Sequence, residues 1–86
     1  MSNEILHINE VRYLRDYILY IEFDNGEKKA VDVSPLLTGP VFEPLHNKNL
    51  FLKVTIDPIS KTIVWPNGAD LAPEALLALK AVECVA

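Results

Sequence analysis

Two carboxylates stand four residues apart near the end of the chain, in the segment VWPNGADLAPE at residues 64–74. A pair of carboxylates can act as general acid and general base, or can hold a divalent cation. Asp70 and Glu74 provide such a pair, and Asp32 is a third candidate, although nothing in the sequence places it beside them. One hypothesis is therefore a small carboxylate-dependent or metal-dependent enzyme that uses Asp32, Asp70 and Glu74.

The same segment is also explained as architecture. Trp65 ends an expected strand inside the core, and the Pro-Asn-Gly sequence after it is typical of a turn. Asp70 can accept backbone hydrogen bonds, and Pro73 suits the first position of a helix. Since these roles explain the segment and no histidine accompanies the acids, we expect no catalytic residue, no metal ligand and no cofactor.

Partner binding is the remaining hypothesis for this segment, because loops held on a rigid scaffold commonly carry recognition. The candidate contact residues are Trp65, Asn67, Asp70, Glu74 and Asp32.

Basic and aromatic residues gather on the expected first strands and suggest a different function. A sheet face that mixes cations with aromatic rings can bind single-stranded nucleic acid. The residues concerned are Arg12, Arg15, Lys28, Lys29, Tyr13, Tyr17 and Tyr20. The alternative is a solvated face with cross-strand ion pairs such as Glu22–Lys28. The net charge of −4, from 12 acidic and 8 basic residues, weighs against nucleic acid as a partner.

The 86 residues, half of them apolar, are enough for a single domain with its own core. No apolar stretch approaches the roughly 18 residues of a membrane span, and the N-terminal MSNEILHINE does not resemble a secretory signal. We therefore expect a soluble cytoplasmic protein with no membrane contact. The single cysteine, Cys84, cannot form an intramolecular disulfide, and His7 and His46 stand too far apart for a structural zinc site.

A hairpin is predicted at the start of the chain. Residues 5–16 predict a first strand whose apolar pattern slips near Asn9–Glu10, which indicates an irregular start or a bulge. Residues 17–23 and 27–33 predict the paired strands. A three-residue loop with Gly26 in the left-handed conformation is favoured over a two-residue Asn-Gly turn. Only the longer loop gathers the apolar side chains on one face, since it pairs Leu19 with Val31: these are Leu19, Ile21, Phe23, Val31 and Val33.

Short helical pieces are predicted after this hairpin. Ser34 suits an N-cap, Pro35 the first helical position and Gly39 a stop, which together predict one helical turn. Because prolines interrupt the next stretch, we expect a turn at residues 41–45 and a short helix near residues 48–52.

A second hairpin and a closing helix complete the chain. A four-residue loop at residues 58–61 pairs Ile56 with Ile63 and Val54 with Trp65. The sequence PEALLALKAVE at residues 73–83 predicts an amphipathic C-terminal helix, with Glu74 at the positive end of its dipole.

The combined pattern predicts an α+β fold, with residues 1–86 as a single domain. We expect the two hairpins and the N-terminal strand to form one antiparallel sheet. The short helices and the C-terminal helix should pack on one face of it.

Four stretches together resemble a bacterial family of domains of unknown function, numbered 2442: FDNGEKKAVDVSPLL, GPVFEPL, LFLKVTID and TIVWPNGADLAPE. The resemblance spans about Val11 to Leu77, and its most specific part is the string W-P-N-G-A-D-x-A-P-E at Trp65 to Glu74. It implies a compact α+β domain with no assigned catalytic residues. Members of this family are encoded beside another small protein, in pairs suspected of being toxin–antitoxin systems. The resemblance therefore implies a partner-binding module.

We accordingly expect a protein–protein interaction module, with the antitoxin-like member of a two-protein system as its finer form. Enzymatic activity is the less favoured alternative, and a nucleic-acid-binding accessory protein is another. A chain of this size and apolar content carries more hydrophobic side chains than one small sheet and three short helices easily hide. We therefore also expect association, including a two-fold homodimer through the terminal helix or a sheet edge.

Overall fold

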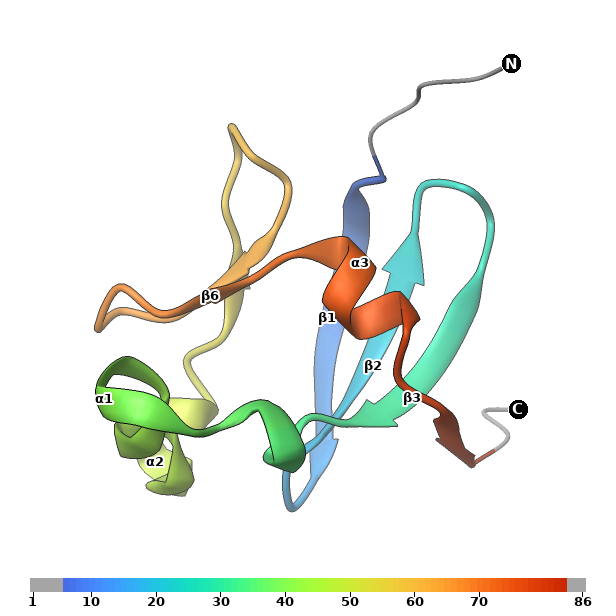
Figure 1. The fold of residues 1–86 in the computed structure, drawn as a ribbon. Coiled ribbons are helices and arrows are strands. Elements are labelled where there is room, and N and C mark those ends of the chain that lie inside the picture. The colour runs from blue at the N-terminus through green and yellow to red at the C-terminus, as the bar shows by residue number, and fades with distance from the viewer. Residues whose placement is uncertain (1–5, 84–86) are drawn as a thin grey trace.

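The computed structural model describes residues 6–83 and shows two antiparallel sheets with short helices, which confirms the predicted α+β class (Figure 1). The larger sheet has the strand order β1-β2-β3-β7. Its strands are β1 (Ile8–Arg15), β2 (Ile18–Phe23), β3 (Lys28–Asp32) and β7 (Ala81–Glu83). The smaller sheet has the order β4-β5-β6, with β4 (Thr55–Ile56), β5 (Ile63–Val64) and β6 (Asp70–Leu71).

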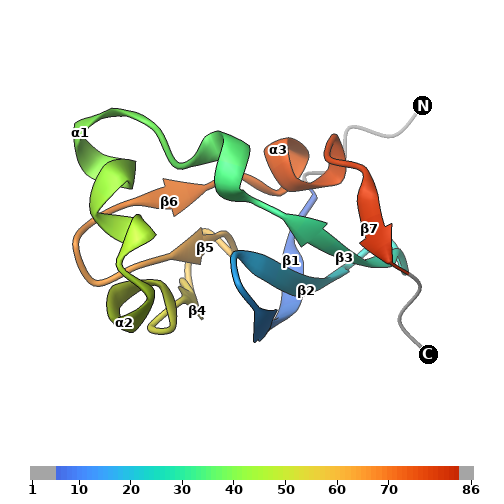
Figure 2. The same cartoon turned by 90° about the horizontal axis from the view of Figure 1, so that it is seen from below.

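Five short helical segments connect or cover these strands. They are η1 (Ser34–Leu36), α1 (Gly39–Phe42), η2 (Glu43–His46), α2 (Lys48–Phe51) and α3 (Pro73–Leu77), where η marks a 3₁₀ turn. Figure 2 shows α1 and α2 gathered beside the three-stranded sheet, whereas β7 forms the far edge of the four-stranded sheet. The predicted helix near residues 48–52 is thus confirmed as α2, and the expected turn at residues 41–45 is helical.

The register predicted for the first hairpin is confirmed. Leu19 lies opposite Val31, and the amide of Phe23 donates to the carbonyl of Glu27 at 2.8 Å. Gly26 has φ +92°, the left-handed conformation that the three-residue loop requires. All five apolar side chains of the shared face are buried. The predicted irregularity in the first strand is also present, as a register shift between Ile8 and Glu10.

The second hairpin has the predicted loop. Ile56 lies opposite Ile63, and the amide of Asp57 donates to the carbonyl of Thr62 at 2.9 Å, which leaves residues 58–61 as the loop. The ladder ends at the next pair, Thr55 with Val64, so the expected pairing of Val54 with Trp65 is wrong. The amide of Val54 donates instead to the carbonyl of Phe51, because the chain is leaving α2 at this point.

The expectation of one continuous sheet is wrong in its detail, because the second hairpin builds a sheet of its own. β5 pairs with β4 on one side and with β6 on the other. β1 and β4 lie close together, and the amide of Ile8 donates to the carbonyl of Lys61 at 2.9 Å. Residue alternation sets which face of a strand is apolar, but it does not select which strand edges meet.

The predicted C-terminal helix is wrong beyond Leu77. Pro73 does occupy the first turn of α3, but the chain then extends and forms β7. Strand β7 covers the edge of β3, through the pairs Ala81–Val31 and Glu83–Ala30. An unpaired strand edge leaves backbone groups without partners, so this tertiary pairing outweighs the helical preference of the segment. Cys84 lies outside the described residues.

Two predicted roles around the first helical turn are also corrected. Ser34 lies inside η1 and not at its N-cap; its amide donates to the carboxylate of Asp32 at 2.9 Å. Gly39 begins α1, with φ +88°, where a stop had been expected. Val33 occupies the N-cap position of η1 without a side-chain cap bond, and Leu37 is its C-cap residue.

One buried cluster forms the core. It draws side chains from both sheets and from η2, α2 and α3, so the two sheets share a single core. Its members are Ile8, Leu19, Ile21, Phe23, Val31, Val33, Leu37, Leu45, Phe51, Ile63, Trp65, Ala69, Leu71 and Leu76.

Candidate functional site

Trp65 lies in the core, as predicted, with 3% of its surface exposed. Its indole stacks on Phe51, with ring centroids 5.8 Å apart and planes 29° apart. The indole N–H donates to the carbonyl of Phe51 at 3.0 Å, so its polar group is satisfied inside the protein. Trp65 therefore supports the turn from within the core and offers almost no surface area to a partner.

The turn after Trp65 is held by four hydrogen bonds. The amides of Trp65 and Gly68 bond to the carbonyls of Ala69 and Trp65, at 2.9 and 3.0 Å. Gly68 has φ +94°, which explains why glycine stands there. The side chain of Asn67 accepts from the amide of Ala69 at 3.1 Å and donates to the carbonyl of Val41 at 2.9 Å. Asn67 thus ties the turn to α1.

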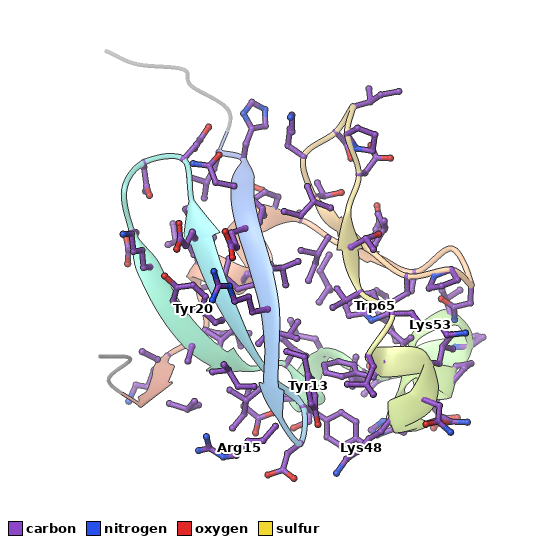
Figure 3. All side chains as sticks on the ribbon, turned by 180° about the vertical axis from the view of Figure 1, so that it is seen from behind. Tyr13, Arg15, Tyr20, Lys48, Lys53 and Trp65 are labelled. Carbon is purple, nitrogen blue, oxygen red and sulfur yellow. The ribbon has the colours of Figure 1, made fainter. Side chains whose placement is uncertain are left out.

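Two exposed aliphatic residues stand in segments that are hydrogen-bonded to Trp65 and to this turn. Val41 in α1 is 47% exposed, and Leu52 just after α2 is 48% exposed. The bond from Asn67 brings Val41 to the turn, and the bond from Trp65 to Phe51 brings the residue before Leu52. Figure 3 shows Trp65 close to Lys53, the neighbour of Leu52 in the chain. We call Val41, Leu52, Pro66 and Asn67 the turn surface.

The candidate carboxylates occupy different parts of the fold. Asp70 is exposed on β6, and Glu74 is exposed in the first turn of α3. Asp32 is half-buried at the end of β3 and accepts the amide of Ser34. Within residues 6–83, the side chain of Asp70 accepts no hydrogen bond from the backbone, in contrast to its expected role. No group of three or more His, Cys, Asp or Glu in these residues could hold a metal ion.

The basic and aromatic residues do not form one face. Tyr13 and Tyr17 point toward the core, where their rings meet the edge of Phe51 at centroid distances of 6.0 and 5.2 Å. Tyr20 points to the opposite side of the sheet, as the labelled side chains in Figure 3 show. Lys29 donates to the carbonyl of Leu77 at 2.7 Å and so ties β3 to the end of α3.

The outer face of the sheet carries paired polar groups. Arg12 forms an ion pair with Glu10, which raises the pKa of Arg12. Tyr20 donates to Glu22 at 2.6 Å, and this hydrogen bond raises the pKa of Tyr20. Glu22 lies opposite Lys28, as the predicted register required. This arrangement fits the alternative of a solvated face, because its cations stand beside carboxylates that would repel phosphate.

At the tip of the β4–β5 hairpin, the sequence interpretation predicted the loop but missed the role of Asp57. The carboxylate of Asp57 accepts the amides of Ile59 and Ser60, at 3.2 and 2.6 Å, and the hydroxyl of Ser60 at 2.8 Å. The bonds from Ser60 and Ile59 hold the pKa of Asp57 below its usual value of 3.8. The available signal was an Asp followed by Ser three residues later, a spacing typical of side-chain-capped turns.

Two histidines make structural contacts elsewhere. The ring of His7 lies 3.0 Å from the carboxylate of Asp24 and joins the start of β1 to the first hairpin loop. Nε2 of His46 lies 2.8 Å from the carbonyl of Leu37, and therefore carries the hydrogen of that bond. The carbonyl of His46 in turn accepts the hydroxyl of Tyr17. These contacts hold loops in place.

Among residues 6–83, no helix is long and apolar enough to cross a bilayer.

Comparison with known proteins adds one finding. Neither the curated proteins nor the solved structures gave a significant match. The family model for a protein of unknown function, DUF2442, matches residues 8–81 and so covers most of the chain. That match includes the two hairpins, the turn after Trp65 and α3. The chain belongs to the DUF2442 family.

Proposed function

We propose that this domain is a protein–protein interaction module and that the turn surface is its contact site. The observation that supports it is the pair of half-exposed aliphatic side chains, Val41 and Leu52, held at one rigid turn. Val41 lies in α1 and Leu52 directly follows α2, and the bonds of Asn67 and Trp65 link these two segments to the turn. Apolar side chains on a pre-ordered surface are the groups that gain most when a partner covers them.

The rigidity of the turn matters for affinity. A loop that must become ordered on binding loses conformational entropy, and this cost is subtracted from the binding free energy. The bonds of Asn67 and the positive φ of Gly68 already fix the backbone here. The exposed acids Asp70 and Glu74 follow the turn in the chain and provide polar groups near its rim, whereas Asp32 is engaged with Ser34.

The finer form of the proposal is an antitoxin-like member of a two-protein system in the cytoplasm. The family resemblance supports it, since it implies a protein partner encoded beside this one. Neither an enzyme nor a nucleic-acid-binding protein is proposed, because no observation on the carboxylates or on the outer sheet face favours one.

Substitution of the two aliphatic residues tests the proposal. A partner is first isolated from the protein's own cells with tagged wild type, and the purified partner is then titrated by calorimetry. Val41→Ser and Leu52→Ser should each weaken binding by about tenfold, the usual effect of truncating a central contact residue. Leu14→Ser is the matched control, because Leu14 is a similarly exposed aliphatic residue, at 37%, on β1.

Folding is checked in the same variants. Since all three positions are exposed, the midpoint of chemical unfolding should stay close to that of the wild type. Wild-type affinity in both Val41→Ser and Leu52→Ser, with these midpoints preserved, would show that the turn surface is not the contact site.

A further inference from the structure

The chain contains two Asn-Gly pairs, and the structure places both in loops of the same form. Asn25-Gly26 lies in the loop between β2 and β3, and Asn67-Gly68 lies in the loop between β5 and β6. Figures 1 and 2 show these loops on opposite sides of the molecule. An asparagine before glycine is prone to react with its own backbone, because glycine has no side chain to hinder the approach.

The two loops share the same backbone hydrogen bonds. In each loop the preceding aromatic residue donates its amide to the carbonyl of the residue that ends the loop, at 2.8 Å for Phe23 and 2.9 Å for Trp65. The glycine amide donates to the carbonyl of that same aromatic residue, at 3.1 Å for Gly26 and 3.0 Å for Gly68. The two glycines have φ +92° and +94°. Both asparagines therefore meet the glycine nitrogen on a matched backbone.

The asparagine side chains differ in one hydrogen bond. In both loops Oδ1 accepts the amide two residues further on, at 2.9 Å from Glu27 to Asn25 and at 3.1 Å from Ala69 to Asn67. Nδ2 of Asn67 also donates to the carbonyl of Val41 at 2.9 Å. Nδ2 of Asn25 has no such acceptor among the described residues. Both asparagines are exposed, so water reaches both loops.

The reaction that these pairs can undergo is intramolecular and needs only water. The backbone nitrogen of glycine loses its proton and attacks Cγ of the asparagine, so that an N–Cγ bond forms and the Cγ–Nδ2 bond breaks. Nδ2 takes up a proton and leaves as ammonia, and a cyclic succinimide remains. Water then opens the ring at either carbonyl, which yields an aspartate or an isoaspartate and makes the chain more negative.

We propose that Asn25 is a site of spontaneous deamidation in the folded protein and that Asn67 is protected from it. Nδ2 is the leaving group, and in Asn67 it is held by a carbonyl of α1. Because Cγ has to move toward the glycine nitrogen, this bond must break in addition to the bonds that both loops share. The value of one hydrogen bond corresponds to a reaction about two- to tenfold faster at Asn25 than at Asn67.

The two conversions would have different consequences for the structure. Conversion of Asn67 to aspartate would keep an acceptor for the amide of Ala69 but remove the donor to Val41, so the turn surface would lose its tie to α1. Conversion of Asn25 to aspartate would keep the bond from the amide of Glu27. The loop that is open to the reaction is thus the one whose side-chain bond survives conversion to aspartate.

Peptide mapping of the folded full chain measures both rates in one sample. The protein is held in warm, mildly alkaline buffer, samples taken over time are digested with trypsin, and the mass increase from amide to acid is followed. Trypsin places Asn25 in residues 16–28 and Asn67 in residues 62–80, and each of these peptides contains a single side-chain amide. Asn25 should be converted about two- to tenfold faster.

Three controls separate the bond to Val41 from the local sequence. In the chain unfolded in guanidinium chloride that bond is absent, so the two rates should approach each other. Pro66→Asp makes both tripeptides Asp-Asn-Gly and should leave the ratio of the folded protein unchanged. Asn25→Gln requires closure of a larger ring and should stop conversion at that position without changing the rate at Asn67.

Several outcomes would overturn the proposal. One is a rate at Asn67 that equals or exceeds the rate at Asn25 in the folded protein. Another is an excess at Asn25 that persists in the unfolded chain or disappears in Pro66→Asp, because the sequence would then be its cause. A third is a folded protein in which neither amide is converted while the unfolded chain reacts, since Asn25 would then be protected as well.

Discussion

At the residue scale, Trp65 connects the turn that follows it to α2. Its ring stacks on Phe51 in α2, its N–H bonds to the carbonyl of the same residue, and its backbone closes the turn to Ala69. Removal of the indole would therefore create a cavity and remove one of the two hydrogen bonds that the carbonyl of Phe51 accepts, the other coming from the amide of Val54. Both effects are destabilising, and they act at the place where the turn surface is supported.

Trp65→Ala should lower the free energy of unfolding by roughly 3–5 kcal/mol, the usual range for a buried aromatic residue. Trp65→Phe keeps an aromatic ring but loses the bond to the carbonyl of Phe51, which still accepts the amide of Val54. It should therefore cost less, about 0.5–1.5 kcal/mol for one lost hydrogen bond. Urea unfolding followed by circular dichroism measures both. An unchanged midpoint in Trp65→Ala would contradict the core position of the indole.

Asp70 is a residue whose charge has no structural task that we can identify in the described part of the chain. Asp70→Asn keeps the shape and one acceptor oxygen, so its free energy of unfolding should stay within about 0.5 kcal/mol of the wild type. Calorimetric titration with Mg²⁺ and Ca²⁺ should show no tight binding. A tight cation site in the wild type that this variant loses would restore the hypothesis of a metal-dependent enzyme.

At the scale of elements, the β4–β5 hairpin depends on one carboxylate. Two ladder pairs are few for an isolated hairpin, and Asp57 supplies three further bonds across its loop. The first hairpin differs, because its strands are longer and the side chain that bonds within its loop is the uncharged amide of Asn25. The two hairpins should therefore respond differently to acid.

The contribution of Asp57 to stability should be lost in acid. Its pKa is lowered in the folded protein by the bonds from Ser60 and Ile59. Above the unfolded value, near 3.8, the carboxylate is charged in both states and its stabilisation is fully present. As the pH falls below 3.8 and through the lowered folded pKa, the folded state must take up the proton at a cost, and the stabilisation disappears.

Thermal unfolding of the wild type and of Asp57→Ala, from neutral pH down through 3.8, tests this expectation. The wild type should be the more stable of the two at neutral pH, and the two midpoints should converge in acid. A difference between them that is independent of pH would show that the charge of Asp57 does not act through these bonds.

At the scale of the whole molecule, one small core is shared by two sheets, and of their outer strands β7, β4 and β6 are short whereas β1 is long. The described chain measures 40 × 29 × 19 Å, so few side chains lie far from the surface. Strand β7 is the outermost strand of the larger sheet, and its Val82 is 44% exposed. Since α3 is short and buries Leu76, a sheet edge is now the better route to association than a terminal helix.

We propose that the protein self-associates through β7, with two copies pairing their edge strands about a two-fold axis. Sedimentation over a wide concentration range should show a monomer–dimer equilibrium. Val82→Lys, which places a charge on the edge, should shift it toward monomer, whereas Val82→Thr should have a smaller effect. A wild type that remains monomeric at high concentration would contradict this proposal.

The sequence by itself determined the features that depend on neighbouring residues. The loop of the first hairpin follows from Gly26 and from the alternation of apolar residues. The four-residue loop of the second hairpin, residues 58–61, follows from the alternation of the strands on either side of it. The burial of Trp65 follows from the same alternation, and the start of α3 from Pro73. Turn chemistry and side-chain alternation act over a few positions, so a single chain displays them directly.

The tertiary structure decided which distant segments meet. Residues 81–83 form a strand because they pair with the edge of β3, and residues 70–71 form one because they pair with β5. The second hairpin thereby belongs to a separate three-stranded sheet, where one sheet had been expected. The register of β1 on β2 places Tyr13 and Tyr20 on opposite faces of the sheet. The bond from Asn67 to Val41 joins residues that lie far apart in the chain. These outcomes depend on edge pairing and packing between residues far apart in the chain, whose free energies exceed local preferences and leave no local pattern in the sequence.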